Sequence, residues 1–233
     1  MVALFVVLTF AALILIDIVV QKVSYARARQ TAGAYELKSG LALAPAFAGL
    51  DVNHFKMEKG LFYSNNHTWA KIDEDGHVKL GIDDFLQKVV GKIDRIELLN
   101  PGESVKAGDK LIKIIQNGRA MYLKSPVDGR VVMVNRGLEA DPSKIKVDPY
   151  KSWAVELEPE NLSKSIHSMK IADSAARWFG RELKRFKEFV NVEMNPNSLV
   201  GQTAQDGGIP VDGLLERMED RSWKKFENEF LAQ

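Results

Sequence analysis

The sequence contains no cysteine among its 233 residues. This absence excludes disulfides, thiolate metal sites and cysteine nucleophiles. It does not indicate whether the protein resides in an oxidising or a reducing compartment. The chain also lacks an excess of either charge, because 32 basic residues face 31 acidic ones and the net charge is +1. No bulk attraction to nucleic acid follows from that balance, so nucleic-acid binding is not expected.

Motifs that carry catalysis are also missing. There is no glycine-rich phosphate loop, no Gly-x-Ser-x-Gly elbow and no His-Glu-x-x-His pair. The four histidines are scattered, and none is spaced as a metal ligand on an expected helix. Asp83 and Asp84 are adjacent, and neighbours on a helix point apart, so they predict a helix N-terminal turn rather than an acid–base pair. The sequence therefore predicts no catalytic residues, no metal site and no enzyme.

One long apolar run stands at the N-terminus. Residues 2–20 contain a single charge, Asp17, and 19 residues suffice to cross the hydrocarbon core of a bilayer. A signal peptide is the competing interpretation, but no basic residue precedes the run. The pattern favours an uncleaved transmembrane anchor over residues 1–22, followed by a juxtamembrane connector over residues 23–59.

Charges beside this run predict its orientation. Lys22, Arg27 and Arg29 follow it directly, and the positive-inside rule places them in the cytoplasm. The expected location is the inner (cytoplasmic) membrane, crossed once, with the soluble part in the cytoplasm. Asp17 lies near the end of the run, where it can snorkel to the interface or pair with a partner helix. Both roles stay open, and the second makes Asp17 a candidate partner-binding residue.

Residues 60–165 predict a small β structure. Short segments that alternate apolar and polar residues are separated by turn-forming clusters such as residues 73–76. Residues 110–115 and 119–124 flank Asn117-Gly118, a pair that favours the type I′ turn of a tight β-hairpin. Many short strands with regular turns indicate a sandwich or barrel.

Several segments in this region resemble one family in the order expected. They are Tyr63-Ser64-Asn65-Asn66-His67-Thr68-Trp69, Gly81-Ile82-Asp83-Asp84-Phe85, Gly102-Glu103-Ser104-Val105-Lys106-Ala107-Gly108-Asp109, Ser125-Pro126-Val127-Asp128-Gly129 and Asp148-Pro149-Tyr150. Together they resemble the glycine cleavage system H protein over residues 60–162. The resemblance implies a lipoyl-type β barrel-sandwich and a structural role for His67, packed near Trp69. It also implies a hairpin whose tip lysine carries lipoate.

The hairpin tip departs from that family. The family's turn is Glu-Ser-Val-Lys-Ala, whereas this chain has Gln116-Asn117-Gly118-Arg119-Ala120 and a loop one residue shorter. Arginine cannot form the amide that attaches lipoate. The sequence therefore predicts a degenerate lipoyl site at Gln116, Asn117, Gly118 and Arg119, and no bound cofactor.

Residues 166–233 are expected to form a helical extension that the resemblance does not cover. Apolar residues recur at helical spacing over residues 168–190, with a basic opposite face, and Trp223, Phe226 and Phe230 form a second stripe. Such stripes predict docking on a partner or on the membrane, with Trp178, Phe179, Trp223, Phe226 and Phe230 as candidate contacts. The alternative is that the stripes pack on the chain's own β domain.

The predicted function is that of a membrane-anchored, non-lipoylated H-protein-like accessory or scaffold subunit. Its partners would be membrane lipid, through the N-terminal helix, and the other subunits of a larger membrane complex, which could be a redox complex. A first alternative is a working lipoyl carrier of a glycine-cleavage-type system, modified at Lys124 or Lys113. A second is a membrane-fusion-type export adaptor, although such adaptors usually carry a long helical hairpin where this chain has only a two-residue turn.

Overall fold

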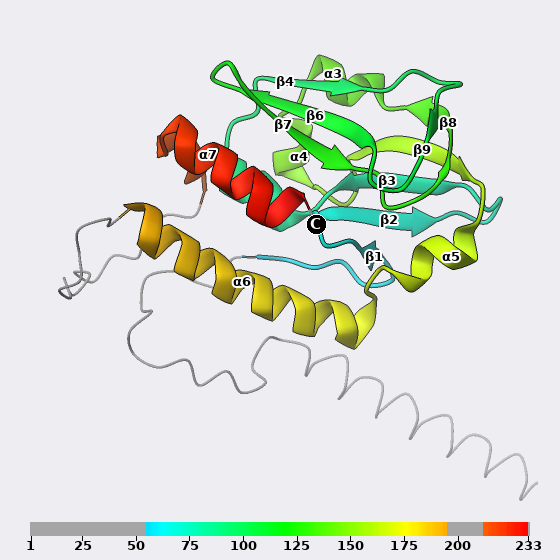
Figure 1. Ribbon diagram of the computed structural model, residues 1–233. Coiled ribbons are helices and arrows are strands. Elements are labelled where there is room, and N and C mark those ends of the chain that lie inside the picture. The colour runs from blue at the N-terminus through cyan, green and yellow to red at the C-terminus, as the bar shows by residue number, and fades with distance from the viewer. Residues whose placement is uncertain (1–54, 195–211, 233) are drawn as a thin grey trace, which may run out of the picture. The chain divides into compact units, whose positions relative to one another are not determined.

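The computed structural model describes residues 55–194 and 212–232. These residues all belong to one compact unit, Phe47–Gln233. It combines two β-sheets with helices that lie in their connections and after the last strand (Figure 1). The prediction of a mainly β domain with a helical C-terminal extension is confirmed.

The larger sheet has six strands, in the order β1-β2-β3-β9-β8-β5. Its paired neighbours are all antiparallel. The strands are β1 (Phe62–Tyr63), β2 (Thr68–Ile72), β3 (Val78–Ile82), β9 (Trp153–Pro159), β8 (Gly129–Val134) and β5 (Ser104–Val105).

The smaller sheet has three antiparallel strands in the order β4-β6-β7. They are β4 (Arg95–Leu98), β6 (Lys110–Gln116) and β7 (Arg119–Lys124). Strands β6 and β7 form the predicted hairpin, with Gln116 opposite Arg119. Asn117 and Gly118 both have positive φ, 49° and 75°, as a type I′ turn requires.

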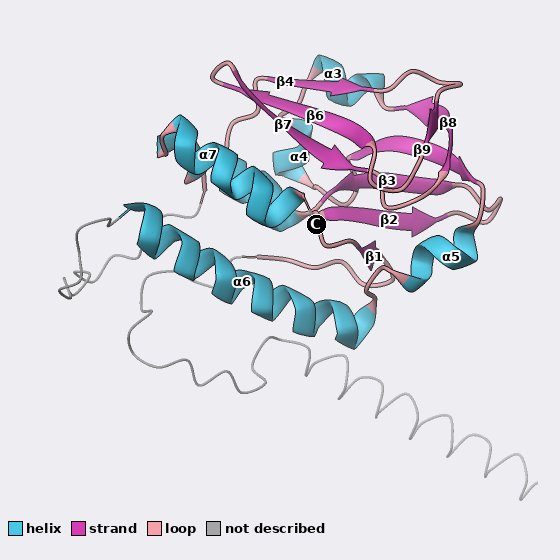
Figure 2. Cartoon of the chain, viewed as in Figure 1, coloured by secondary structure: helices cyan, strands magenta, loops and turns pink. Residues whose placement is uncertain are grey.

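Helices occupy the connections and the C-terminal part (Figure 2). They are α2 (Asp84–Val90), α3 (Arg136–Ala140), α4 (Lys144–Val147), α5 (Leu162–His167), α6 (Ala172–Met194), the 3₁₀ turn η3 (Leu215–Arg217), α7 (Asp220–Phe226) and the π-helical turn η4 (Glu227–Leu231). The helical pattern expected over residues 168–190 corresponds to α6, and the second stripe, Trp223, Phe226 and Phe230, lies on α7 and η4.

A cluster of phenylalanines joins the extension to the β domain. Phe85 of α2 lies 5.1 Å from Phe186 of α6 and 6.3 Å from Phe230 of η4, measured between ring centroids. Phe226 and Phe230 stack on each other at 4.8 Å. All four rings are at most 1% exposed. The core therefore runs continuously from the sheets through α2 into α6 and α7.

This packing corrects one prediction. Trp178, Phe179, Trp223, Phe226 and Phe230 are each at most 4% exposed and belong to the core of this chain. They are not a free docking surface for a partner or the membrane. The prediction was wrong because a helical stripe shows only that a face is apolar, and the β domain here offers α2 and β7 to cover it.

The predictions for the N-terminal part concern residues that the structure does not describe. The proposed span of residues 2–20, Asp17 and most of the connector lie outside the described residues. Within residues 55–194 and 212–232, no helix has both the length and the hydropathy that a membrane crossing requires.

Candidate functional site: the hairpin tip and its cover

Arg119 is the first residue of β7, directly after the hairpin turn. Its guanidinium donates from Nη1 to the carbonyl of Met218 at 2.8 Å and from Nη2 to that of Leu215 at 3.3 Å. The same group lies 4.5 Å from the centroid of the Trp223 ring, a cation–π arrangement. The side chain is only 14% exposed. Arg119 is thus fixed by the chain's own C-terminal segment, defined here as residues 212–232.

Gln116 forms the other side of the tip and is fully buried. Its Nε2 donates to the carbonyls of Val90 and Lys92, both at 2.6 Å. A glutamate carboxylate at this position could not donate to either carbonyl. The amide therefore explains why glutamine, and not the glutamate of the resembled turn, fits here.

Two glycines let the C-terminal segment approach α2. A Cβ atom on Gly91 would lie 2.4 Å from Cα of Gly213, and both glycines have positive φ. The backbone N–H of Gly213 donates to the carbonyl of Lys88 at 2.8 Å. Only glycine accommodates both the close contact and the backbone conformation.

The C-terminal segment also covers β7 along its length. Glu227 accepts from the backbone N–H of Tyr122 at 3.0 Å, and the Trp223 Nε1 donates to the carbonyl of Ala120 at 3.5 Å. β7 is the last strand of its sheet, so these side chains satisfy part of an exposed edge. The hairpin is closed on the side that β6 does not occupy.

The two lysines considered for lipoylation lie away from the tip. Lys113 Nζ donates to the Glu97 carboxylate at 2.8 Å. Lys124, at the far end of β7, donates to the carbonyl of Ala232 at 2.8 Å. Neither fits a swinging arm, which needs an exposed lysine at the turn. The residues at this hairpin do not fit lipoyl attachment.

His67 forms a second polar cluster, beneath α6. It is fully buried, its Nδ1 lies 2.7 Å from Asp83 Oδ2, and its Nε2 lies 3.6 Å from Glu182 Oε1. Burial alone would lower the pKa of His67, but the charges of Asp83 and Glu182 and the hydrogen bond with Asp83 outweigh it and raise the pKa to about 9. The imidazole is therefore protonated at neutral pH.

The rings around His67 differ from those the resemblance implies. The imidazole stacks on Phe85 at 4.4 Å and lies 5.4 Å from Trp178. Trp69 instead donates its indole N–H to the carbonyls of Ile82 and Pro149. The backbone of His67 has a positive φ of 61°. No pattern in the sequence pointed to Glu182, which is 115 positions away.

Asp83 and Asp84 have separate roles. Asp83 caps α2 by accepting from the backbone N–H of Leu86, as expected for a helix N-terminus. Asp84 instead accepts from the backbone of Lys56 at 2.7 Å and pairs with Lys88 at 2.8 Å. The two carboxylates therefore bind different groups, as expected for neighbours on a helix.

One group of potential metal ligands was missed from the sequence. Each of Asp75, His77 and Glu156 offers one side-chain atom that could bind a metal, and these three atoms lie within 4.8 Å of one another. The ammonium of Lys79 lies 3.7 Å from Glu156, so a cation already faces this group. The cluster is explained as a surface ion-pair network.

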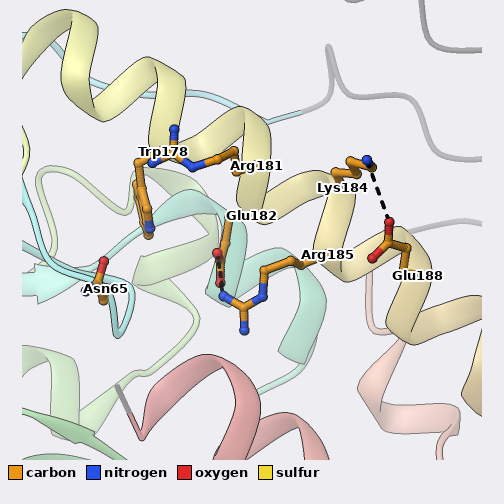
Figure 3. A pocket seen from close by; sticks show the side chains of 7 residues that line it. All are labelled: Asn65, Trp178, Arg181, Glu182, Lys184, Arg185 and Glu188. Atoms are coloured by element: carbon orange, nitrogen blue, oxygen red, sulfur yellow. Dashed lines mark hydrogen bonds and ion pairs between the residues drawn. The ribbon is translucent and has the colours of Figure 1, made fainter.

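A hollow of about 450 Å³ opens beside the His67 cluster (Figure 3). Glu182 and Arg185 of α6 face each other on one side of it, and Asn65 lies on the loop opposite. Arg185 Nη1 donates to both oxygens of Glu182, at 2.9 and 2.8 Å. The lining residues are Asn65, Trp178, Arg181, Glu182, Lys184, Arg185 and Glu188.

Comparisons with known proteins decide the family. The profile of the glycine cleavage H-protein matches residues 61–178, about half of the chain. The chain belongs to the glycine cleavage H-protein family. The probable glycine cleavage system H protein of Thermococcus gammatolerans is 35% identical over 129 residues, which cover 55% of this chain and 96% of that protein. The glycine cleavage system H protein of Thermoanaerobacter sp. (strain X514) is 38% identical over 124 residues, covering 53% and 97%.

A solved structure is also similar. The crystal structure of a glycine cleavage system H protein from Mycobacterium marinum matches with a TM-score of 0.48 and 24% identity, covering 54% of this chain and 98% of that one. The family match ends at residue 178. Most of α6 and all of the C-terminal segment that covers the hairpin therefore lie outside the H-protein domain.

Proposed function

We propose that this chain is an H-protein-family binding module that carries no lipoate and serves as an accessory or scaffold subunit of a larger assembly. The observation that carries this proposal is that the Arg119 side chain is bound by other parts of the chain. Its guanidinium is held by two carbonyls of the C-terminal segment and by the Trp223 ring. A side chain that is bound in this way neither accepts a lipoyl group nor swings between partner sites.

The cover over the hairpin supports the same proposal. Displacing the C-terminal segment would expose Trp223, Phe226 and Phe230, which are now at most 2% exposed. Each such aromatic ring contributes about 1.5–3 kcal/mol when it is fully buried. The segment therefore acts as a permanent part of the domain rather than a lid that opens for each reaction cycle.

The membrane location belongs to this proposal as well. The apolar run of residues 2–20 and the basic residues that follow it support a single anchor, with the H-protein-like domain in the cytoplasm. A carbonate wash should leave the full chain in the membrane fraction. Protease added outside intact cells should not cleave residues 60–233, and cleavage there would contradict the topology.

A lipoyl carrier is the second candidate, and the comparisons favour it over the scaffold role. Its support is family membership, since both relatives described above bear the name of the glycine cleavage system H protein. On this alternative the lipoyl group would be attached to a lysine outside the turn. No observation on the described residues favours an export adaptor.

Intact mass spectrometry of the protein from its native source separates the two candidates. We expect the unmodified mass, and no lipoyl-lysine on peptides between Lys110 and Arg130. A lipoyl mass shift would overturn the proposal, and Lys113→Arg and Lys124→Arg would then locate the modified residue. Arg119→Lys is the matched variant: it should remain unmodified, because the turn is one residue short and the C-terminal segment still covers it.

The scaffold role has its own test. The full chain should co-purify with other membrane subunits from mild detergent, and mass spectrometry identifies them. Isolation of the chain alone, from cells that express it at native level, would argue against a scaffold.

A further inference from the structure

The hollow beside α6 has polar groups that nothing in the proposed function uses. It is lined by the cationic side chains of Arg181, Lys184 and Arg185 and by the carboxylates of Glu182 and Glu188. Both oxygens of Glu182 are already bound by Arg185. The negative charge of that carboxylate is therefore largely compensated within the wall of the hollow.

Two donors at the rim lack a partner within the part of the chain that the structure describes. Within residues 55–194 and 212–232, neither the Arg181 guanidinium nor the Asn65 amide forms a hydrogen bond or an ion pair, and Arg181 is exposed. Lys184 contacts Glu188 only at 4.0 Å, the limit for an ion pair. These three groups come from two sides, because Asn65 lies on the loop before β2 whereas Arg181 and Lys184 lie on α6 (Figure 3).

The positive charge near the rim is not balanced. Lys170 lies 5.7 Å from the centroid of Trp178, a residue that lines the hollow. Burial lowers the pKa of Lys170, the charge of Arg181 lowers it further, and Glu182 only partly opposes them. Two positive charges held close together repel each other, and an anion bound between or beside them relieves that repulsion.

A buried cation lies behind the wall. The Nε2 of His67 is fully buried and has no hydrogen-bond partner among the described residues, and it points toward Glu182 at 3.6 Å. With Asp83 and Glu182 as its counter-charges, this imidazolium further reduces the net negative charge that an approaching ligand meets. The side of the hollow formed by α6 therefore favours an anion.

We propose that the hollow lined by Asn65, Arg181 and Lys184 is a binding site for a phosphate-type oxyanion. Arginine and lysine side chains with an amide donor suit tetrahedral oxygens, since a guanidinium donates in a fixed fork and an ammonium acts as a point charge. The Trp178 ring supplies an apolar wall for whatever group bears the oxyanion. The oxyanion comes either from a free phosphate compound or from a phospholipid headgroup.

Calorimetric titration of the full chain in a neutral detergent with inorganic phosphate tests the site. We expect saturable binding that is weakened about tenfold or more by Arg181→Gln and by Lys184→Gln, as for the loss of one charge-assisted contact of about 1.4 kcal/mol. Arg177→Gln is the matched control, because Arg177 is also exposed on α6 but does not line the hollow. It should change the affinity by less than about twofold, within the ~0.4 kcal/mol expected of an exposed charge that makes no direct contact with the anion.

A second arm distinguishes the sources of the oxyanion. The same variants are titrated with phosphatidic acid in neutral detergent micelles. Binding of phosphate alone supports a soluble ligand, whereas Arg181-dependent binding of the lipid alone supports a headgroup. Absence of binding in both arms overturns the proposal, as does equal weakening by Arg177→Gln and Arg181→Gln.

Discussion

Two cations, one half-buried and one fully buried, lie where the C-terminal helices meet the β domain, and they are stabilised in opposite ways. Arg119 is bound by two neutral carbonyls and an aromatic ring, and its nearest carboxylate, Asp220, lies 3.8 Å away and is 84% exposed. His67 is held between the carboxylates of Asp83 and Glu182, both nearly fully buried. Arginine keeps its charge at any accessible pH, so dipoles suffice to hold it, whereas a buried histidine is charged only with anions beside it.

The extension is attached through Arg119 by carbonyl dipoles and through His67 by carboxylates. Arg119 joins the hairpin to the C-terminal segment, and His67 joins the first half of the domain to α6. Both rest on the same apolar core. The following changes separate these contributions, beginning with the core itself.

The largest effect is expected from truncation after Val190. It removes Trp223, Phe226 and Phe230, and aromatic-to-alanine changes in a core each cost about 3–5 kcal/mol. Their sum approaches or exceeds the total stability of a typical domain, about 5–15 kcal/mol. We expect the truncated protein to lose its cooperative thermal transition, as monitored by circular dichroism. Asn228→Ala, at an exposed position of η4, is the control and should melt like the unaltered protein, and a folded truncated domain would show that the extension is not part of the core.

Raising the pH should weaken the His67 contact. The pKa is raised from 6.5 to about 9 on folding, so the stabilisation is complete below about pH 6.5 and is lost as the pH rises through about 9. At 1.36 kcal/mol per pKa unit, the loss is about 3 kcal/mol. Urea unfolding at a series of pH values measures it.

His67→Gln is the matched variant for this titration. Other groups also titrate at high pH, so the difference between the two proteins isolates the histidine. The difference in unfolding free energy between the unaltered protein and His67→Gln should narrow from pH 6 to pH 10. Parallel curves would mean that the imidazole is neutral in the folded protein.

Arg119→Lys should have a smaller effect. Lysine lacks the planar fork that reaches two carbonyls and stacks on Trp223, and one unmade buried hydrogen bond costs about 1–3 kcal/mol. We expect the free energy of unfolding, measured in urea at neutral pH, to fall by about 1–2 kcal/mol. Arg95→Lys is the control, since its pair with Glu97 is 64% and 42% exposed. Equal effects of the two substitutions would contradict a specific role for Arg119.

Lys225→Ala should have the smallest effect. Lys225 pairs with Glu193 at 2.6 Å and so joins α7 to α6, but its side chain is 41% exposed. Such pairs contribute up to about 1 kcal/mol and weaken with salt. The melting temperature should fall slightly at low salt and not at high salt, whereas Lys224→Ala, on the exposed side of α7, should leave it unchanged. A large, salt-independent fall would indicate that the stem of Lys225 matters more than its charge.

Local chemistry was enough to predict much of the domain from the sequence. The hairpin followed from Asn117-Gly118, because few residue pairs adopt two positive φ values without strain. The N-cap role of Asp83 followed from its position before an apolar helix. The likeness of ordered segments to the H-protein family was likewise visible, and the comparisons bear it out.

What only the tertiary structure decided is where the distant residues meet. A helical stripe in a sequence shows that a face is apolar but not what covers it, so Trp223 and Phe226 were expected on a partner and lie in the core. Arg119 could be seen to lack the chemistry of a lipoyl lysine, but its hydrogen-bond partners, Leu215 and Met218, are almost a hundred positions away. The buried charge of His67 depends in the same way on Glu182, since the pKa of a group is fixed by neighbours in space that no local pattern records.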